Sequence, residues 1–178
     1  YFAMRFGGLY RDIELQVTPQ VYIDDAWVRG DFDARAAEVH VDVAGGVPDG
    51  LRLHVTVGDE TREVPAEEGE NIVRLPLKDF RPWSPEHPNL YTARVELVAN
   101  GAVTMTRHER FGVRKLEVLG KEFRLNGRPF FFRGCGDNHP YPETGCPPAD
   151  RAYHLKHLKI AKQAGFNYIR LHTHCEVP

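Results

Sequence analysis

Two largely apolar segments, each running directly into a cluster of polar side chains, constrain the fold of this chain more than any other feature. The first covers residues 130–132 and leads into the polar stretch 133–140, and the second covers residues 167–171 and leads into 172–176. An apolar run without polar alternation is typical of a strand that is buried on both faces. Strand, polar loop, helix and strand in this order are typical of a (β/α)₈ barrel, whose active-site residues follow the carboxyl ends of the strands. Because the chain reaches Pro178 after two such strands, we expect the first βαβ unit of an incomplete TIM (β/α)₈ barrel.

One helix is predicted between the two segments. Residues 147–150 hold two prolines and an Asp that suit a helix start, and Gly165 suits the C′ position at its end. Leu155 and Leu158 recur at helical spacing, whereas Lys156 can face water. We expect the crossover between the two strands to be right-handed.

Alternation of apolar and polar residues dominates the preceding part of the chain, from Ile13 to about Phe111. A period of two residues predicts β-strands, and the turn-forming residues between them recur at the spacing of an antiparallel immunoglobulin-like sandwich. The residues expected to point inward are Val39, Val41, Val43, Leu51, Leu53, Val55, Val57, Tyr91, Ala93, Val95 and Leu97. The predicted fold class is therefore mainly β: an immunoglobulin-like β-sandwich followed by the first βαβ unit of an incomplete TIM (β/α)₈ barrel.

Two Asn-Gly pairs predict tight hairpins, because both central residues of a type I′ turn need a positive φ. One pair is residues 100–101 within the sandwich, and the other is residues 126–127 in a hairpin that precedes the first barrel strand.

A proline-rich loop at residues 82–90 interrupts the alternation, and the next strand is expected to start at Leu90. Trp83 and Tyr91 allow two interpretations. Either they are buried and pack the loop against the sandwich, or they are exposed and a sugar ring stacks on them. Burial is favoured, because large aromatic side chains belong to a protein core more often than to a ligand site.

Composition argues against several classes of partner. The net charge is −2 and no run of Lys or Arg occurs, so we expect neither nucleic acid nor an anionic membrane surface as a partner. No apolar stretch approaches the roughly 20 residues of a membrane span, and the first residues lack the zones of a signal peptide. Because strand alternation is already present at residues 13–17, we expect an internal piece of a longer protein. These features assign no compartment.

Histidines and cysteines in the last third of the chain raise the possibility of zinc. Their spacing includes no CxxC and no HExxH, so we expect neither a metal nor another cofactor. The chain contains three cysteines, and an odd number cannot all pair, so we do not expect disulfide bonds to hold this fold together. The residues concerned are His139, His172, His174, Cys135, Cys146 and Cys175.

Three segments in order resemble glycoside hydrolase family 2, which holds β-galactosidases, β-glucuronidases and β-mannosidases. They are Gly-Gly-Leu-Tyr-Arg-Asp at 7–12, Trp-Ser-Pro-Glu-His-Pro-Asn-Leu-Tyr at 83–91, and the stretch 111–134. The resemblance implies that residues 1–18 end a jelly-roll sugar-binding domain and that residues 19–112 form the sandwich. It implies further that residues 113–178 are a linker hairpin and the start of the catalytic barrel.

The resemblance also bears on the catalytic residues. The family's two catalytic carboxylates follow later barrel strands, so it implies that no catalytic residue lies in this chain and that both are encoded beyond Pro178. Asp137 and Glu176 both follow predicted strand ends and could in principle form the pair themselves. The favoured interpretation is that Asp137 accepts hydrogen bonds from sugar hydroxyls and that Glu176 orients a neighbour or caps a helix.

Polar residues after the two strands are the candidate substrate-binding residues. Arg133 and Arg170 lie inside apolar strands, where a buried guanidinium must be paired or hydrogen-bonded, and the residue that matches Arg170 in the family lies close to the nucleophile. The candidates are Asp137, Asn138, His139, Arg170, His172, His174 and Glu176.

The expected function follows from these residues and the resemblance together. We expect a fragment of a retaining glycoside hydrolase that acts on β-linked glycosides, inactive by itself, with a carbohydrate substrate in the full-length enzyme. The alternative is a non-catalytic sandwich module that binds carbohydrate or protein. Two barrel strands without their neighbours expose apolar faces, so self-association of the barrel piece is also expected.

Overall fold

The computed structural model of the chain describes residues 13–137, 141, 148 and 150–171. Residues 16–130 form one compact unit, and the described residues from Phe131 onward belong to another. Among the described residues the fold is mainly β, as predicted, and it contains one helix. No described helix has the length and apolar character needed to cross a membrane.

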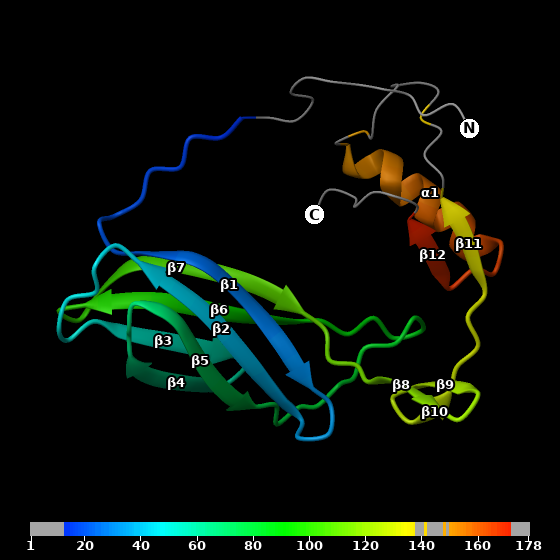
Figure 1. Cartoon of the computed structure of the whole chain (residues 1–178), viewed down its shortest axis with the longest axis horizontal. Helices are drawn as coiled ribbons and strands as arrows, with labels where there is room; N and C mark the ends of the chain where they lie inside the picture. The colour runs from blue at the N-terminus through cyan, green and yellow to red at the C-terminus, as the bar shows by residue number, and fades with distance from the viewer. Residues whose placement is uncertain (1–12, 138–140, 142–147, 149, 172–178) are drawn as a thin grey trace. The chain divides into compact units, whose positions relative to one another are not determined.

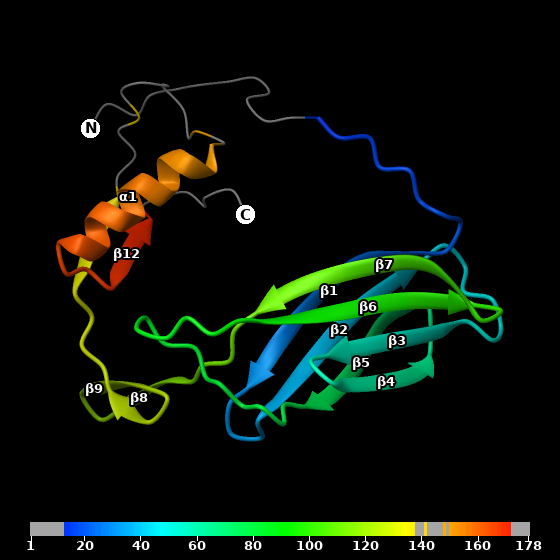
Figure 2. The same cartoon turned by 180° about the vertical axis from the view of Figure 1, so that it is seen from behind.

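Seven strands of the first unit form two sheets that pack face to face (Figures 1 and 2). One sheet has the order β1-β2-β5 and the other the order β4-β3-β6-β7. All neighbouring strands are antiparallel, and an antiparallel sandwich is the arrangement predicted from the alternation. The strands are β1 (Tyr22–Asp31), β2 (Ala36–Ala44), β3 (Arg52–Val57), β4 (Glu60–Pro65), β5 (Gly69–Pro76), β6 (Tyr91–Ala99) and β7 (Ala102–Phe111).

The core lies between these two sheets. Alternate residues of β2, β3 and β6 are fully buried there, because successive side chains of a strand point to opposite faces. The inward residues predicted from the sequence are confirmed except for Tyr91, which is half-buried, and β6 begins one residue later than expected. The buried residues are Val39, Val41, Val43, Leu51, Leu53, Val55, Val57, Ala93, Val95 and Leu97.

Both predicted hairpins are present. Asn100 and Gly101 have φ values of 51° and 76°, and Asn126 and Gly127 have φ values of 53° and 78°, as a type I′ turn requires. The second turn joins β9 (Glu122–Leu125) to β10 (Arg128–Pro129), and β8 (Leu116–Leu119) completes a small sheet of order β10-β9-β8.

The second unit contains a strand, a helix and a strand. β11 (Gly134–Asp137) and β12 (Tyr168–Leu171) pair in parallel, and α1 (Arg151–Gln163) lies between them in the chain. Asp150 is the N-cap of α1, and its Oδ1 accepts a hydrogen bond from the Ala152 backbone N–H at 2.8 Å. The helix is followed by Gly165, as the sequence predicts.

The first strand of this unit does not lie where the apolar run predicts it. Phe131 is 77% exposed, and the strand starts at Gly134. The reason lies in the hydrogen bonds: the Phe130 N–H donates to Phe123 O in the small sheet, at 2.8 Å, so it continues that sheet. Arg133 and Arg170, expected to be buried, are exposed among the described residues.

Candidate functional site

The carboxyl ends of β11 and β12 lie next to each other, where the sequence places the candidate binding residues. Asp137, the last residue of β11, pairs with Leu171, and Arg170 pairs with Gly136. Parallel strands end at the same edge of a sheet, so this pairing brings the two polar stretches that follow the strands to one edge.

Asp137 and Arg170 lie on opposite faces of this pair of strands. Residues that pair across a sheet share a face, and successive residues alternate between faces. Arg170 therefore shares its face with Gly136, whereas Asp137 shares its face with Cys135, and both Asp137 and Cys135 are half-buried. The other candidates, Asn138, His139, His172, His174 and Glu176, lie outside the described residues.

Asn167 ties the start of β12 to the residues before β11. Its Oδ1 accepts from the Arg133 backbone N–H at 2.8 Å, and its Nδ2 donates to Phe131 O at 3.0 Å. The Arg133 guanidinium is used nearby, where Nε donates to Gly165 O at 2.8 Å. Both residues therefore hold the beginnings of the strands, at the end opposite to the candidate site.

No metal centre is formed by the described residues: they contain no group of three or more His, Cys, Asp or Glu side chains that could hold an ion. Cys135 is a free thiol. Cys146, Cys175, His139, His172 and His174 lie outside the described residues.

A joint within residues 16–130 connects the sandwich to the small sheet, and the sequence analysis missed it. Asn126 Oδ1 accepts from the Lys115 backbone N–H at 2.9 Å, and Asn126 Nδ2 donates to Trp83 O at 2.9 Å. Lys115 Nζ lies 2.6 Å from Asp33 Oδ2 and 3.0 Å from Glu117 Oε1, and hydrogen bonds to these carboxylates raise the pKa of Lys115. An Asn-Gly turn is visible in a sequence, but the partners of its side chain are not.

The proline-rich loop is fastened by its two aromatic residues, which supports the burial interpretation over a sugar platform. Trp83 is half-buried, and its backbone N–H donates to Val113 O at 2.8 Å. The Arg114 guanidinium lies 5.0 Å from the centroid of the Trp83 ring. Tyr91 Oη donates to Asp79 O at 2.9 Å and accepts from the Arg81 N–H at 2.6 Å. A tyrosine at the start of β6 that bonds back to the preceding backbone is the tyrosine corner of immunoglobulin-like sandwiches.

A groove lies beside this joint, between the proline-rich loop and the hairpin of β9 and β10. Its volume of about 660 Å³ lies in the range of small-molecule sites. Its walls combine aromatic residues with two arginines, but the polar side chains of Asn89 and Asn126 already bond backbone carbonyls. These hydrogen bonds assign Asn89 and Asn126 to the joint.

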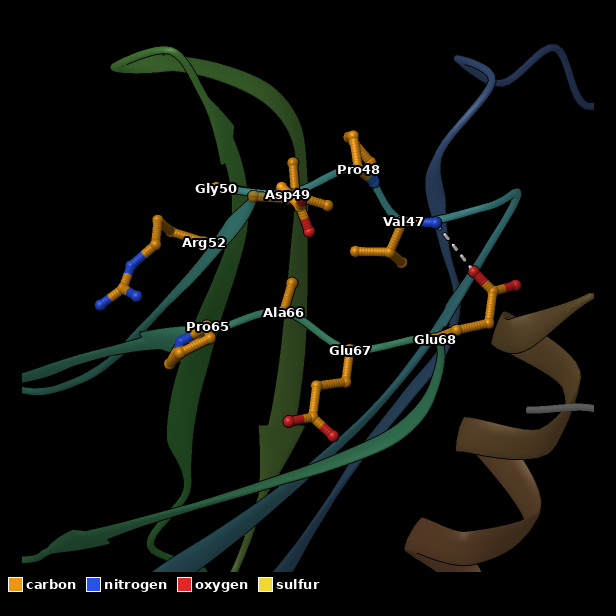
Figure 3. A pocket seen from close by; sticks show the side chains of 10 residues that line it. Val47, Pro48, Asp49, Gly50, Arg52, Pro65, Ala66, Glu67 and Glu68 are labelled. Carbon is orange, nitrogen blue, oxygen red and sulfur yellow. Dashed lines mark hydrogen bonds between the residues drawn. The ribbon is translucent and has the colours of Figure 1, made fainter.

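A second hollow of about 400 Å³ lies at one end of the sandwich, between residues 47–52 and 65–68 (Figure 3). At its rim the Glu68 carboxylate accepts hydrogen bonds from the N–H groups of Gly45, Gly46 and Val47, at 3.0 to 3.2 Å. This carboxylate closes the loop by filling its cluster of backbone donors.

Comparisons with known proteins agree with this architecture. The family model "Glycosyl hydrolases family 2" matches residues 21–114, which is more than half of the chain. A β-galactosidase of Pseudoalteromonas haloplanktis is 27% identical over 183 residues, which cover 92% of this chain and 18% of that enzyme. A β-glucuronidase of Streptococcus agalactiae is 29% identical over 169 residues, which cover 93% of this chain and 27% of that enzyme.

A solved structure of similar fold is the GH2 β-galacturonidase from Eisenbergiella tayi bound to galacturonate. The TM-score is 0.72 at 22% identity, over 89% of this chain and 30% of that one. The chain thus spans less than a third of the relatives and of the structure named here. With the family model matched across the whole seven-strand sandwich, the chain belongs to family 2 of the glycosyl hydrolases.

Proposed function

We propose that this chain is an internal part of a retaining β-glycosidase, in which the sandwich and its joint support a catalytic barrel begun by β11, α1 and β12. The observation that carries the proposal is the parallel pairing of β11 with β12 directly after a family 2 sandwich. Parallel strands joined through a helix are the repeating unit of a (β/α)₈ barrel. The domain boundaries that go with this proposal are residues 18/19 and 112/113.

The catalytic carboxylates come from later strands in this proposal. Retaining hydrolysis needs one carboxylic acid that protonates the leaving oxygen and one carboxylate that attacks the anomeric carbon, about 5–5.5 Å apart. Of the two carboxylates that could form the pair in this chain, Asp137 ends β11 and Glu176 lies outside the described residues, and a single strand pair cannot close a pocket around a sugar. Residues from this chain therefore bind the glycone rather than cleave the bond. These are Asp137, Asn138, His139, Arg170, His172, His174 and Glu176.

Arg170 is the candidate residue on β12, and it lies on the same face of the strand pair as Gly136. A Cβ built at Gly136 would meet nothing within 4 Å, so this face of β11 has room for a neighbouring side chain. In the proposed enzyme the Arg170 guanidinium donates to sugar hydroxyls or holds the nucleophilic carboxylate ionised.

The remaining barrel covers α1 in this proposal. Leu155, Leu158 and Ile160 are 43%, 53% and 54% exposed, and none of the residues of α1 is buried. A helix with this much exposed apolar surface needs a covering neighbour.

The test of the proposal is the sequence and the activity of the full-length protein. We expect six further strand–helix units beyond Pro178, with an Asn-Glu pair after the fourth strand, and turnover of one of the β-galactoside, β-glucuronide, β-mannoside or β-glucosaminide substrates. The 178-residue chain alone should hydrolyse none of the corresponding nitrophenyl glycosides. A gene that continues only with further sandwiches would favour a binding module, and turnover by the isolated chain would show that its own carboxylates are catalytic.

A further inference from the structure

The outer face of the β1-β2-β5 sheet carries a row of three side chains, one from each strand. Trp27 pairs with His40, and His40 pairs with Ile72. The neighbouring residues in each strand, such as Val39 and Val73, are buried in the core, so the row points away from it.

The indole of Trp27 is held rigidly on this face. Its ring stacks on the His40 imidazole with centroids 3.6 Å apart and an interplanar angle of 8°. The imidazole is fixed in turn, because Nδ1 lies 2.9 Å from Glu70 Oε1 and Nε2 lies 3.0 Å from Glu38 Oε1. His40 is only 8% exposed whereas Trp27 is 46% exposed, so one face of the indole is covered and the other is open.

Charged side chains border the row on both sides. Arg29, Glu38 and Arg74 form the neighbouring row in the register, with Arg29 bonded to Glu38 at 2.6 Å. On the other side Asp25 pairs with Asp42, and Asp42 pairs with Glu70.

Carboxylates directly opposite one another destabilise a sheet, and within the described residues the Asp42 side chain makes no hydrogen bond or ion pair. Glu70 bonds His40 and Asp25 lies near Arg107, whereas the Asp42 carboxylate keeps its hydrogen-bond acceptors for solvent or a ligand.

We propose that this face binds a carbohydrate chain, with one pyranose ring stacked on the open face of Trp27. The C–H hydrogens on one face of a pyranose carry partial positive charge and fit the negative face of an indole. Its hydroxyl groups donate to carboxylates and accept from guanidinium groups, and both kinds of group border the indole. The residues of this surface belong to β1, β2 and β5, and none of them is a candidate barrel residue, so we assign them to holding the carbohydrate and not to cleaving it.

Other occupants fit less well. Trp27 and Ile72 are the large exposed hydrophobics among the described residues of this face, and a stable protein interface needs about 800 Å² per partner with an apolar core. A nucleic acid or an anionic membrane would meet the carboxylates of Asp25, Asp42 and Glu70 and be repelled.

The test follows the two tryptophan indole N–H signals of the ¹⁵N-labelled chain by NMR during titration with β-linked tetrasaccharides of glucose, galactose or N-acetylglucosamine. We expect a saturable shift of the Trp27 signal with at least one of them and no shift of the Trp83 signal. Trp27→Phe should retain affinity within about threefold because the ring remains, and Trp27→Ala should lose about tenfold or more.

A matched control is Val103→Ala, which removes an exposed apolar side chain of β7, in the other sheet, and should leave affinity unchanged. Thermal unfolding of each variant checks that the sandwich is intact. The proposal is overturned if no tetrasaccharide shifts the Trp27 signal at millimolar concentration, or if Trp27→Ala folds and binds like the parent chain. It is equally overturned if the Trp27 signal moves with protein concentration alone, which would identify a contact between copies. None of these outcomes depends on glycosidase activity, so they leave the proposed function untouched.

Discussion

The side chain of Asn126 donates a hydrogen bond to the backbone carbonyl of Trp83, 43 residues earlier in the chain, at 2.9 Å. The same side chain accepts from the Lys115 N–H. One amide in a two-residue turn thereby connects the proline-rich loop of the sandwich to the segment that enters β8. The joint therefore fixes the small sheet to the sandwich within residues 16–130.

Asn126→Gly should destabilise residues 16–130 by about 1–2 kcal/mol, because it removes two side-chain hydrogen bonds but keeps the positive φ. Asn126→Ala should cost about 1–2 kcal/mol more, since a Cβ without a polar group is strained at φ 53°. Denaturant unfolding of both variants measures the difference. Equal unfolding free energies of Asn126→Gly and the parent chain would show that the two hydrogen bonds of Asn126 do not contribute to stability.

Much of the sandwich could be predicted from the sequence because its causes are local. Alternation puts Val39, Val41 and Val43 in the core whatever the partner strand is. The Asn-Gly pair at 100–101 forms a type I′ turn because of its own backbone preferences. The joint at Asn126 and the row at Trp27 depend on residues far away in the chain, and a one-dimensional pattern contains no sign of them.

The position of the first strand predicted from the apolar run at 130–132 is wrong for a related reason. β11 consists of Gly134–Asp137, whose side chains are small or polar, and nothing in its composition marks a strand. Position 134 requires glycine because of the neighbouring strand: a Cβ built at Gly134 would lie 2.5 Å from Cδ1 of Tyr168 on β12. Of the seven candidate binding residues, the structure describes Asp137 and Arg170, and their roles stay predictions.

Gly134→Ala should weaken the pairing of β11 with β12 by about 1–3 kcal/mol, since the Tyr168 ring must move. Gly136→Ala is the matched control, because a Cβ there meets nothing within 4 Å. Hydrogen exchange of the β11 and β12 amides reports the effect. If the β11 and β12 amides exchange at the same rate in both variants, the close approach of Gly134 and Tyr168 does not limit the strand pairing.

The contribution of Asp31 to stability should disappear in acid. Its Oδ1 accepts from the Ala34 N–H at 2.9 Å and its Oδ2 lies 2.5 Å from the Arg74 guanidinium, and these contacts hold the pKa of Asp31 below its ordinary value of 3.8. A lowered pKa in the folded state stabilises above pH 3.8 and loses that effect as the pH falls through the folded value.

The unfolding free energy of the parent chain should therefore exceed that of Asp31→Asn at pH 7, and the gap should narrow below pH 3.8. A difference in unfolding free energy between the parent chain and Asp31→Asn that stays constant from pH 7 to pH 2.5 would show that the Asp31 carboxylate does not stabilise the fold.

The isolated chain should self-associate through α1. Leu158→Glu places a charge among the exposed apolar residues of this helix and should shift the chain toward the monomer. Lys159→Glu changes the charge at the next position without removing apolar surface and should have little effect. Sedimentation velocity at several concentrations distinguishes the species, and a parent chain that is monomeric throughout would argue against the expectation.

The central claim is that this chain supports and begins the barrel of a retaining β-glycosidase. Its most direct test is proton NMR of the first sugar released by the full-length protein from a nitrophenyl β-glycoside. The account predicts the β-anomer as the first product, followed by slow mutarotation. An α-anomer as the first product, or no hydrolysis of any β-glycoside offered, would contradict it.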